Sequence, residues 1–407
     1  MKIKHIALLL FASLSSMSVF AETDSEASAK TEQEEFPSDE KTEEGFITSY
    51  INRAIESGMQ NLPAPDGTPA YGRTLTDYAS APKFGGYFIG KYNCTDKPGE
   101  PTNGGFSQRM TRLYVDGTIL TDFAYRIQLQ TANSSFHMKD FFIEWKKYPE
   151  FKVKVGQYKR AFGFENPMNP WDVGTGDYAQ VTKKLTGHAD YNGAESTSNG
   201  GRDQGLQFQG DLFPVGSDKH RLIHYQLMVA NGQGINTSDA NKKKDFLGTI
   251  QFQPVKGLCL GLFGWTGDYT AKVSGKNVTM DRDRYMISAR YDKDDWTFRA
   301  EYAHSTGYKL SDYDSATETF SGKGRADGWY ATLGIPCTSW LKVYAKYDVY
   351  RDGADWSSTQ TIYSIAPNIQ LHKNLMFQLQ YNITHDRTLT TSRKNYSDIW
   401  VETYVRF

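Results

Sequence analysis

The feature that most constrains the fold of this chain is an alternation of apolar and polar side chains with a period of two residues. In residues 123–131, rings and aliphatic side chains occupy the odd positions, while Ala, Arg and Gln occupy the even ones. Residues 341–349 and 375–383 repeat the pattern. Because successive side chains of a β-strand point to opposite faces, each segment predicts a strand with an apolar solvent on one face and water on the other.

Sixteen segments of this kind can be counted, and most are close to the roughly 9–11 residues of a tilted membrane strand. They fall near residues 83–92, 109–119, 122–132, 136–146, 151–158, 204–213, 221–230, 245–253, 258–266, 283–292, 295–304, 327–335, 340–349, 360–370, 375–384 and 397–407.

The connections between these segments sort into two kinds. Short, turn-like connections follow even-numbered segments, at 147–150, 254–257, 292–295, 336–339 and 371–374. Long connections follow most odd-numbered segments, at 93–108, 159–203, 231–244, 267–282 and 305–326, with the brief stretch 133–135 as the exception. Short turns on one side and long loops on the other, with an even number of strands, are typical of outer-membrane barrels. We therefore predict an all-β fold, a transmembrane antiparallel β-barrel of about 16 strands.

The alternative all-β fold is a soluble sandwich or solenoid, which would require polar residues where these strands carry Leu, Phe and Tyr.

Composition excludes other classes of protein. Aromatic residues make up 14% of the chain, too many for a disordered protein, and 39% hydrophobic residues is low for a bundle of membrane helices. A net charge of −1 gives no field that would attract nucleic acid, and three cysteines cannot form a disulfide scaffold.

The first residues are typical of an export signal. Residues 1–21 contain a basic start, an apolar stretch and small residues before Glu22, which predicts a signal peptide. Residues 22–45 hold ten acidic residues against two lysines and few large apolar side chains. We therefore expect residues 22–82 to form an acidic, largely disordered periplasmic extension, with one short helix near 46–57, and residues 83–407 to form the barrel.

The last strand ends on an aromatic residue. Residues 399–407 place Ile, Val, Thr, Val and Phe on one face, and Phe407 is the last residue of the sequence. A terminal Phe on such a strand resembles the signal read by the machinery that assembles outer-membrane barrels, which is therefore an expected partner. The alternative is an ordinary edge strand that closes a soluble sheet.

Two stretches resemble a known family. Residues 155–165, which read Val-Gly-Gln-Tyr-Lys-Arg-Ala-Phe-Gly-Phe-Glu and follow the Phe-Ile-Glu-Trp of 142–145, look like the signature of the phosphate-selective porins O and P of Gram-negative outer membranes. Residues 84–92 are similar to the first strand of that family. The resemblance implies a sixteen-stranded porin, a homotrimer in outer-membrane lipid, that admits small anionic solutes. The ladder of arginines and the lysine cluster that line the channel of phosphate-selecting members cannot be placed residue by residue here.

The polar faces of the predicted strands carry ten basic and seven acidic side chains. These charges either pair in ladders across the lumen or select anions by their excess. Four basic residues, Arg126, Lys146, Lys152 and Lys154, lie on three successive strands at the base of the longest connection, 159–203. That connection either folds inward and narrows the pore or forms a surface loop. Our predicted pore-lining and anion-binding residues are Arg126, Lys146, Lys152, Lys154, Arg160, Lys183 and Lys184.

Catalytic, metal and cofactor sites are not expected. His137, His304 and His385 lie near predicted extracellular strand ends without a Gly-x-Ser-x-Gly elbow, and residues 281–283 lack the Gly and distal Glu of a calcium loop. The sequence therefore predicts no enzyme but an outer-membrane porin for passive diffusion of small solutes, with preference for phosphate-like anions. A general or carbohydrate pore is the first alternative, and a surface adhesin built on a barrel is the second.

Overall fold

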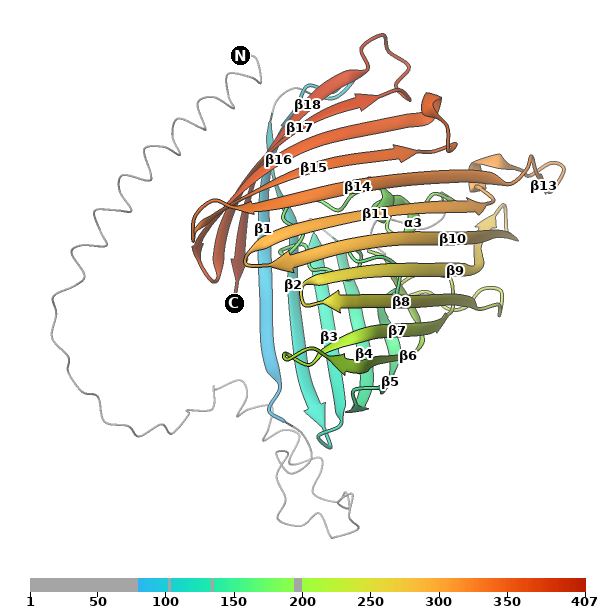
Figure 1. Cartoon of the computed structure of the whole chain (residues 1–407). Helices are drawn as coiled ribbons and strands as arrows, with labels where there is room; N and C mark the ends of the chain where they lie inside the picture. Colours follow the sequence, from blue (N-terminus) through green and yellow to red (C-terminus); the bar gives the residue numbers. More distant parts are fainter. Residues whose placement is uncertain (1–79, 102–103, 133–134, 194–199) are drawn as a thin grey trace, which may run out of the picture. The chain divides into compact units, whose positions relative to one another are not determined.

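The computed structural model describes residues 80–101, 104–132, 135–193 and 200–407. These residues form a closed antiparallel barrel of sixteen strands (Figure 1), which confirms the predicted fold class. The barrel strands are β1 (Lys83–Thr95), β2 (Gly105–Ile119), β3 (Phe123–Ala132), β4 (Ser135–Tyr148), β5 (Phe151–Lys159), β6 (Arg202–Val215), β7 (His220–Ala230), β8 (Asp245–Val255), β9 (Leu258–Val273), β10 (Lys276–Lys293), β11 (Trp296–Gly307), β14 (Gly324–Pro336), β15 (Leu341–Arg351), β16 (Thr359–His372), β17 (Leu375–Asp386) and β18 (Asn395–Arg406).

The barrel closes between its first and last strands. Each barrel strand pairs with the barrel strands that precede and follow it in the chain, and β1 also pairs with β18 in a register that sets Tyr87 opposite Arg406. Beyond the last paired residue, Gly86 and Phe407 exchange backbone hydrogen bonds of 2.9 and 3.0 Å. Closure leaves no free sheet edge, so every strand can satisfy its backbone groups inside a membrane.

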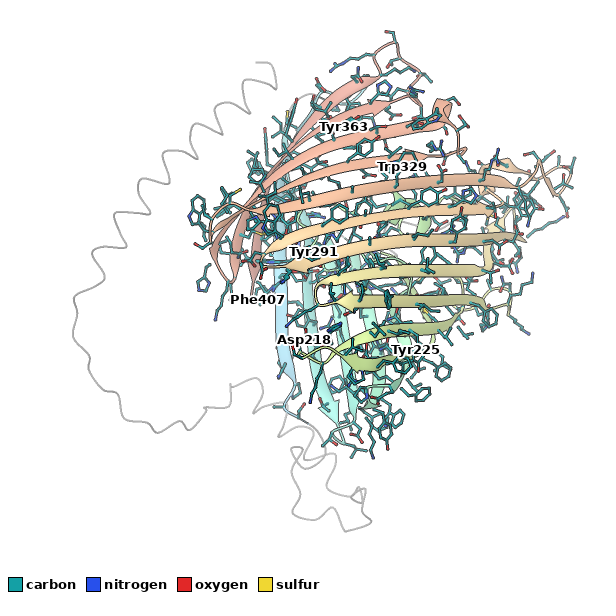
Figure 2. The ribbon with its side chains drawn as sticks, in the orientation of Figure 1. Asp218, Tyr225, Tyr291, Trp329, Tyr363 and Phe407 are labelled. Carbon is teal, nitrogen blue, oxygen red and sulfur yellow. The ribbon has the colours of Figure 1, made fainter. Side chains whose placement is uncertain are left out.

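Side-chain exposure alternates along the strands as predicted. On β9, Leu260 and Leu262 are 43% and 60% exposed on the outer face, whereas Phe263 and Trp265 are buried on the inner face. Outward rings such as Tyr363, which is 53% exposed, are drawn in Figure 2. The outer wall is therefore apolar, as lipid requires.

The short connections at one end of the barrel include two-residue turns of left-handed backbone. Asp294 and Asp295, between β10 and β11, have φ of 50° and 62°. Two consecutive residues with positive φ match the twist of the two strands that they join, as in a type I′ hairpin.

The connections at the other end are mostly longer, as predicted. The prediction was wrong for one of them. Residues 267–282 were expected as a loop, but β9 and β10 continue through this stretch and leave only Ser274 and Gly275 between them. Their pairing extends from Leu258↔Tyr291 to Val273↔Lys276, because strands can continue past the membrane as a hairpin wherever they still pair. Residues 308–323 also contain local structure: the 3₁₀ turn η3 (Leu310–Asp312) and the small sheet of β12 (Tyr313–Asp314) and β13 (Thr319–Phe320).

The remaining elements are the helix α3 (Gln180–Leu185) and the 3₁₀ turn η4 (Trp356–Ser358). Within the part of the chain that the structure describes, no helix has the length and apolar character needed to cross a membrane. The predicted signal peptide lies outside the described residues, as does the predicted extension up to residue 79.

Lipid exposure of β9 can be tested with one charge. We expect Leu262→Arg to reduce the folded fraction, since a cation at the lipid-facing midplane costs about 2–4 kcal/mol. The control Gln253→Arg, on the inward face of β8, should fold normally. The readout is the folded fraction in outer membranes, measured by heat-dependent gel mobility, and equal fractions for the two variants would contradict the assignment of faces.

Candidate functional site inside the barrel

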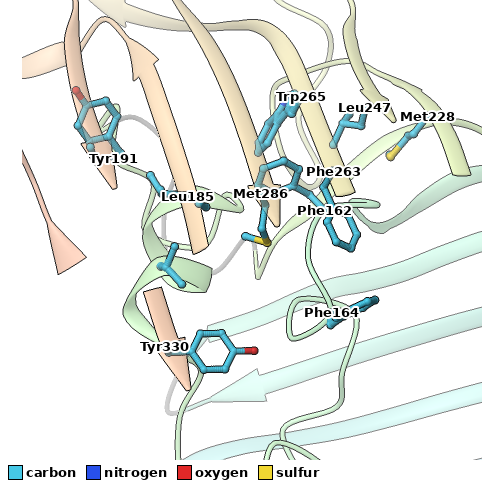
Figure 3. Close-up of a cluster of buried hydrophobic side chains, with 14 of the residues drawn as sticks. Phe162, Phe164, Leu185, Tyr191, Met228, Leu247, Phe263, Trp265, Met286 and Tyr330 are labelled. Carbon is cyan, nitrogen blue, oxygen red and sulfur yellow. The ribbon is translucent and has the colours of Figure 1, made fainter. Parts of the chain in front are cut away.

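The connection between β5 and β6 folds back into the barrel, and we call residues 160–201 the inward loop; within it, 194–199 are outside the described residues. Its first part places two rings against the inner wall of β9 (Figure 3). The Phe162 ring lies 5.6 Å from the Trp265 ring, and the Phe164 ring lies 5.5 Å from the Phe263 ring. The large apolar side chains on the inward face of β9 therefore form the contact surface for this loop.

Part of the described backbone of the inward loop finds its hydrogen-bond partners in side chains of the wall, and several of these are charged. Glu301 of β11 accepts hydrogen bonds from the N–H groups of Phe164 at 2.7 Å and Glu165 at 2.9 Å. Lys159 donates through Nζ to the carbonyl oxygen of Asn166 at 2.7 Å. Because an unsatisfied buried polar group costs about 1–3 kcal/mol, these contacts decide where the loop can lie.

The helix α3 is the part of the inward loop that packs against β11, β14 and β15. Glu165 accepts a hydrogen bond from the N–H of Ala179 at 2.8 Å, and Asp348 of β15 accepts one from the N–H of Gln180 at 2.9 Å. Two of the N–H groups that a helix start leaves without an internal partner are thereby satisfied by carboxylates.

The middle of the inward loop reaches the far wall of the barrel. The Trp171 ring lies 5.6 Å from the Tyr404 ring of β18, and the Arg406 guanidinium lies 4.3 Å over Trp171. The carbonyl of Gly174 accepts a hydrogen bond from Gln378 of β17 at 2.8 Å. The inward loop therefore crosses the lumen from β5 to the wall of β17 and β18.

Removal of one carboxylate tests this anchoring. We expect Glu301→Leu to leave the barrel assembled, because the outer wall is unchanged, but to release the start of the inward loop, because two buried N–H groups lose their acceptor at a cost of about 1–3 kcal/mol each. Single channels in planar bilayers should show larger and noisier conductance than the parent. The control Glu318→Leu, at an exposed carboxylate, should conduct like the parent. Identical conductance of Glu301→Leu and the parent would contradict the anchoring role.

The structure places four of the predicted pore-lining residues on β3, β4 and β5. Lys146 is exposed beside the turn after β4. Arg126, Lys152 and Lys154 lie on inward faces, and each is close to one carboxylate. The pairs are Arg126–Asp116 at 2.7 Å, Lys152–Asp211 at 2.7 Å and Lys154–Glu144 at 3.6 Å.

The other three predicted residues belong to the inward loop. Arg160 is buried and forms an ion pair with Asp203 at 2.7 Å. Lys183 of α3 pairs with Asp177 at 2.9 Å. Lys184, also on α3, is exposed and has no ion pair among the residues that the structure describes.

A cavity of about 390 Å³ brings several of these residues together between the inward loop and the inner wall. We call it the basic chamber. Asp140 is the carboxylate in its lining, and three rings and four side-chain amides also contribute. Its cations are Arg126, Lys154, Lys159, Arg160, Arg202 and Arg290.

Four of these six cations have a carboxylate partner. To the pairs of Arg126, Lys154 and Arg160 given above, Arg202 adds hydrogen bonds of 2.6 and 3.1 Å to Asp140. Six basic side chains against four carboxylates leave two basic residues of the lining, Lys159 and Arg290, without a carboxylate partner among the described residues. Arg290 lies 5.0 Å over the Phe164 ring and has no ion pair within the described ranges.

The pKa of one histidine in the inward loop is affected by two of the same basic residues. Burial, together with the positive charges of Lys159 and Arg202, holds the pKa of His188 well below its usual range. Burial and a positive environment both oppose the addition of a proton to this imidazole.

Sequence reasoning did not include Lys159, Arg202 or Arg290 among the site residues. The period of two places Arg290 on the polar face of its strand, so the sequence pattern was sufficient to identify Arg290 as a lumenal residue. Arg109 was not detectable in this way. The register skips from Met110 to Gln108 opposite β1, and this bulge turns Arg109 inward, where it donates to Glu402 at 2.9 Å.

The chain is similar to one family and to several solved barrels. The family described as phosphate-selective porin O and P matches residues 86–331. No curated protein matches the chain.

The solved structures agree over most of the chain at low identity. An anion-selective porin from Comamonas acidovorans is 13% identical with a TM-score of 0.60, covering 81% of this chain and 100% of its own. A trimer form of OmpT from Vibrio cholerae is 10% identical with a TM-score of 0.53, covering 81% and 100%. The outer membrane channel DcaP of Acinetobacter baumannii is 11% identical with a TM-score of 0.52, covering 81% and 98%. At these identities the likeness shows the fold alone.

Proposed function

Because the chain belongs to the phosphate-selective porin O and P family and is an outer-membrane porin, we propose that its pore prefers small anions, phosphate among them. The observation that carries this proposal is the excess of basic side chains over carboxylates in the basic chamber, with Arg290 left without an ion pair among the described residues. We propose that the sixteen-stranded barrel acts as a channel through which movement is passive, which its family supports.

The paired cations contribute little to this preference. A passing ion meets Arg126 together with Asp116 and Lys154 together with Glu144, so the fields of each pair largely cancel. Lys159 has no carboxylate partner but donates its hydrogen bonds to oxygens of the inward loop, so Arg290 is the chamber cation that has neither an ion pair nor a hydrogen bond to the loop among the described residues. Such charges act strongly on a solute inside a narrow, low-dielectric wall.

Selectivity should therefore depend on Arg290. We expect Arg290→Glu, which changes the local charge by two units, to lower the anion-to-cation permeability ratio severalfold at low salt. The change should be smaller at 1 M salt, where screening shortens to about 3 Å. The measurement is the reversal potential of single channels in a KCl gradient.

Two comparisons make this experiment decisive. Arg290→Gln should give an intermediate ratio, and Lys373→Glu, in an exposed turn between β16 and β17, should leave the ratio unchanged. A ratio for Arg290→Glu within error of the parent at low salt would contradict anion preference by the basic chamber.

We extend the proposal to assembly. OmpT of Vibrio cholerae has a trimer form, which supports a homotrimer in outer-membrane lipid here. Phe407, whose backbone pairs with Gly86 at the closing seam, is proposed to be the residue that the barrel-assembly machinery recognises. Residues 1–21 are proposed to direct export, and residues 22–82 to form an acidic periplasmic extension.

The export proposal predicts the mass of the mature protein. Protein purified from outer membranes is expected to begin at Glu22, because the small residues before it suit cleavage by signal peptidase. Intact mass spectrometry measures this directly. A mature mass that includes residues 1–21 would contradict the assignment.

A further inference from the structure

One wall of the basic chamber has a chemistry that anion preference does not explain. Gln207, Gln226 and Gln251 lie on the inward faces of three consecutive strands, β6, β7 and β8, and all three line the chamber. Amides are neutral, and each offers two N–H donors and a carbonyl acceptor. This wall therefore recognises hydrogen-bonding groups rather than charge.

Gln207 and Gln226 are connected through Gln209, and one acceptor of this group has no partner among the described residues. Gln209 accepts hydrogen bonds through Oε1 from Gln207 at 2.6 Å and from Gln226 at 3.1 Å, and it donates to Glu144. Gln207 is 3% exposed, and its own Oε1 has no hydrogen-bond partner among the described residues. Buried polar atoms are nearly always partnered, so this carbonyl oxygen keeps the capacity to accept one more hydrogen bond.

The other side of the chamber supplies charge and an apolar surface. Lys154 and Arg290 project into it, and the half-buried Phe142 ring lies beneath the Lys154 ammonium at 4.9 Å. Ammonium and guanidinium groups make strong charge-assisted bonds to carboxylate and phosphate.

The chamber is also large for a bare inorganic anion. Its volume of about 390 Å³ lies within the range of roughly 300–1,000 Å³ that is usual for organic ligands.

We infer that the basic chamber is a passage site for hydroxyl-rich organic anions, the class that includes sugar phosphates and sugar acids. The anionic group contacts Arg290, while hydroxyl groups exchange hydrogen bonds with Gln207 and Gln251. This inference rests on the proposed anion preference and specifies its substrate class. Binding must remain weak, because a solute has to leave the site in order to cross.

Current block through single channels of the full-length protein tests the inference. In symmetric KCl, glucose 6-phosphate and glucuronate should each reduce the current by half at a concentration about fivefold lower than inorganic phosphate, since one or two added hydrogen bonds contribute about that factor. Uncharged glucose should block more weakly than either sugar anion. A response to only one of the two sugar anions identifies phosphate or carboxylate as the preferred anionic group.

Matched variants assign the effect to the amide wall. Gln207→Leu should reduce the fivefold advantage to less than about twofold. Gln251→Leu, at a half-buried position, should do the same and provides a second route if Gln207→Leu fails to assemble. Gln253→Leu carries the same change on the same face of β8, outside the chamber, and should retain the advantage.

The outcomes separate this inference from the proposed function. The KCl reversal potential is measured on the same channels. Anion preference with equal block by glucose 6-phosphate and inorganic phosphate would overturn the inference alone, as would an advantage that survives in both amide variants. Loss of anion preference in the parent channel would instead overturn the proposed function.

Discussion

The structure depends on one constraint: the backbone of a long segment placed inside a closed barrel must find hydrogen-bond partners other than a neighbouring strand. The wall provides them with charged side chains. Glu301 and Asp348 accept from N–H groups, and Lys159, Arg299 and Lys346 donate to carbonyl oxygens of the inward loop. A buried backbone group without such a partner would be costly, so these side chains fix the path of the loop.

This constraint decides which lumenal charges remain for a solute. Several cations that a charge count would assign to anion attraction are instead occupied by the loop or by a carboxylate, as Arg160 is by Asp203. What acts on a passing ion is the remainder, and in the basic chamber this is Arg290, which has no ion pair among the described residues and lies beside an amide wall. A pore of this kind separates solutes by the sign of their charge at one wall and by their hydrogen-bonding groups at the other.

The period of two residues was sufficient to predict the barrel, its sixteen strands and the identity of its two faces, because lipid and water impose that period directly. Partners across strands were not predictable from one segment alone. Arg126 and Lys154 could be placed on the inward face, but their pairing with Asp116 and Glu144 depends on register and rotamer. The bulge that turns Arg109 inward breaks the period itself. The inward path of the loop depends on contacts between Phe162 and Trp265, which are about 100 residues apart in the chain.

The most direct test of this account is chemical modification of the inward loop in a conducting channel. Lys184 is exposed on α3, and α3 packs against the inner wall, so a cysteine there faces the lumen. In a Cys337→Ser background, which removes the exposed native thiol, a Lys184→Cys channel is treated with an anionic thiosulfonate during recording. The account predicts a stepwise fall in single-channel current and in the anion-to-cation permeability ratio as each channel reacts. A current that stays unchanged after complete labelling, confirmed by mass spectrometry, would contradict a loop inside the pore.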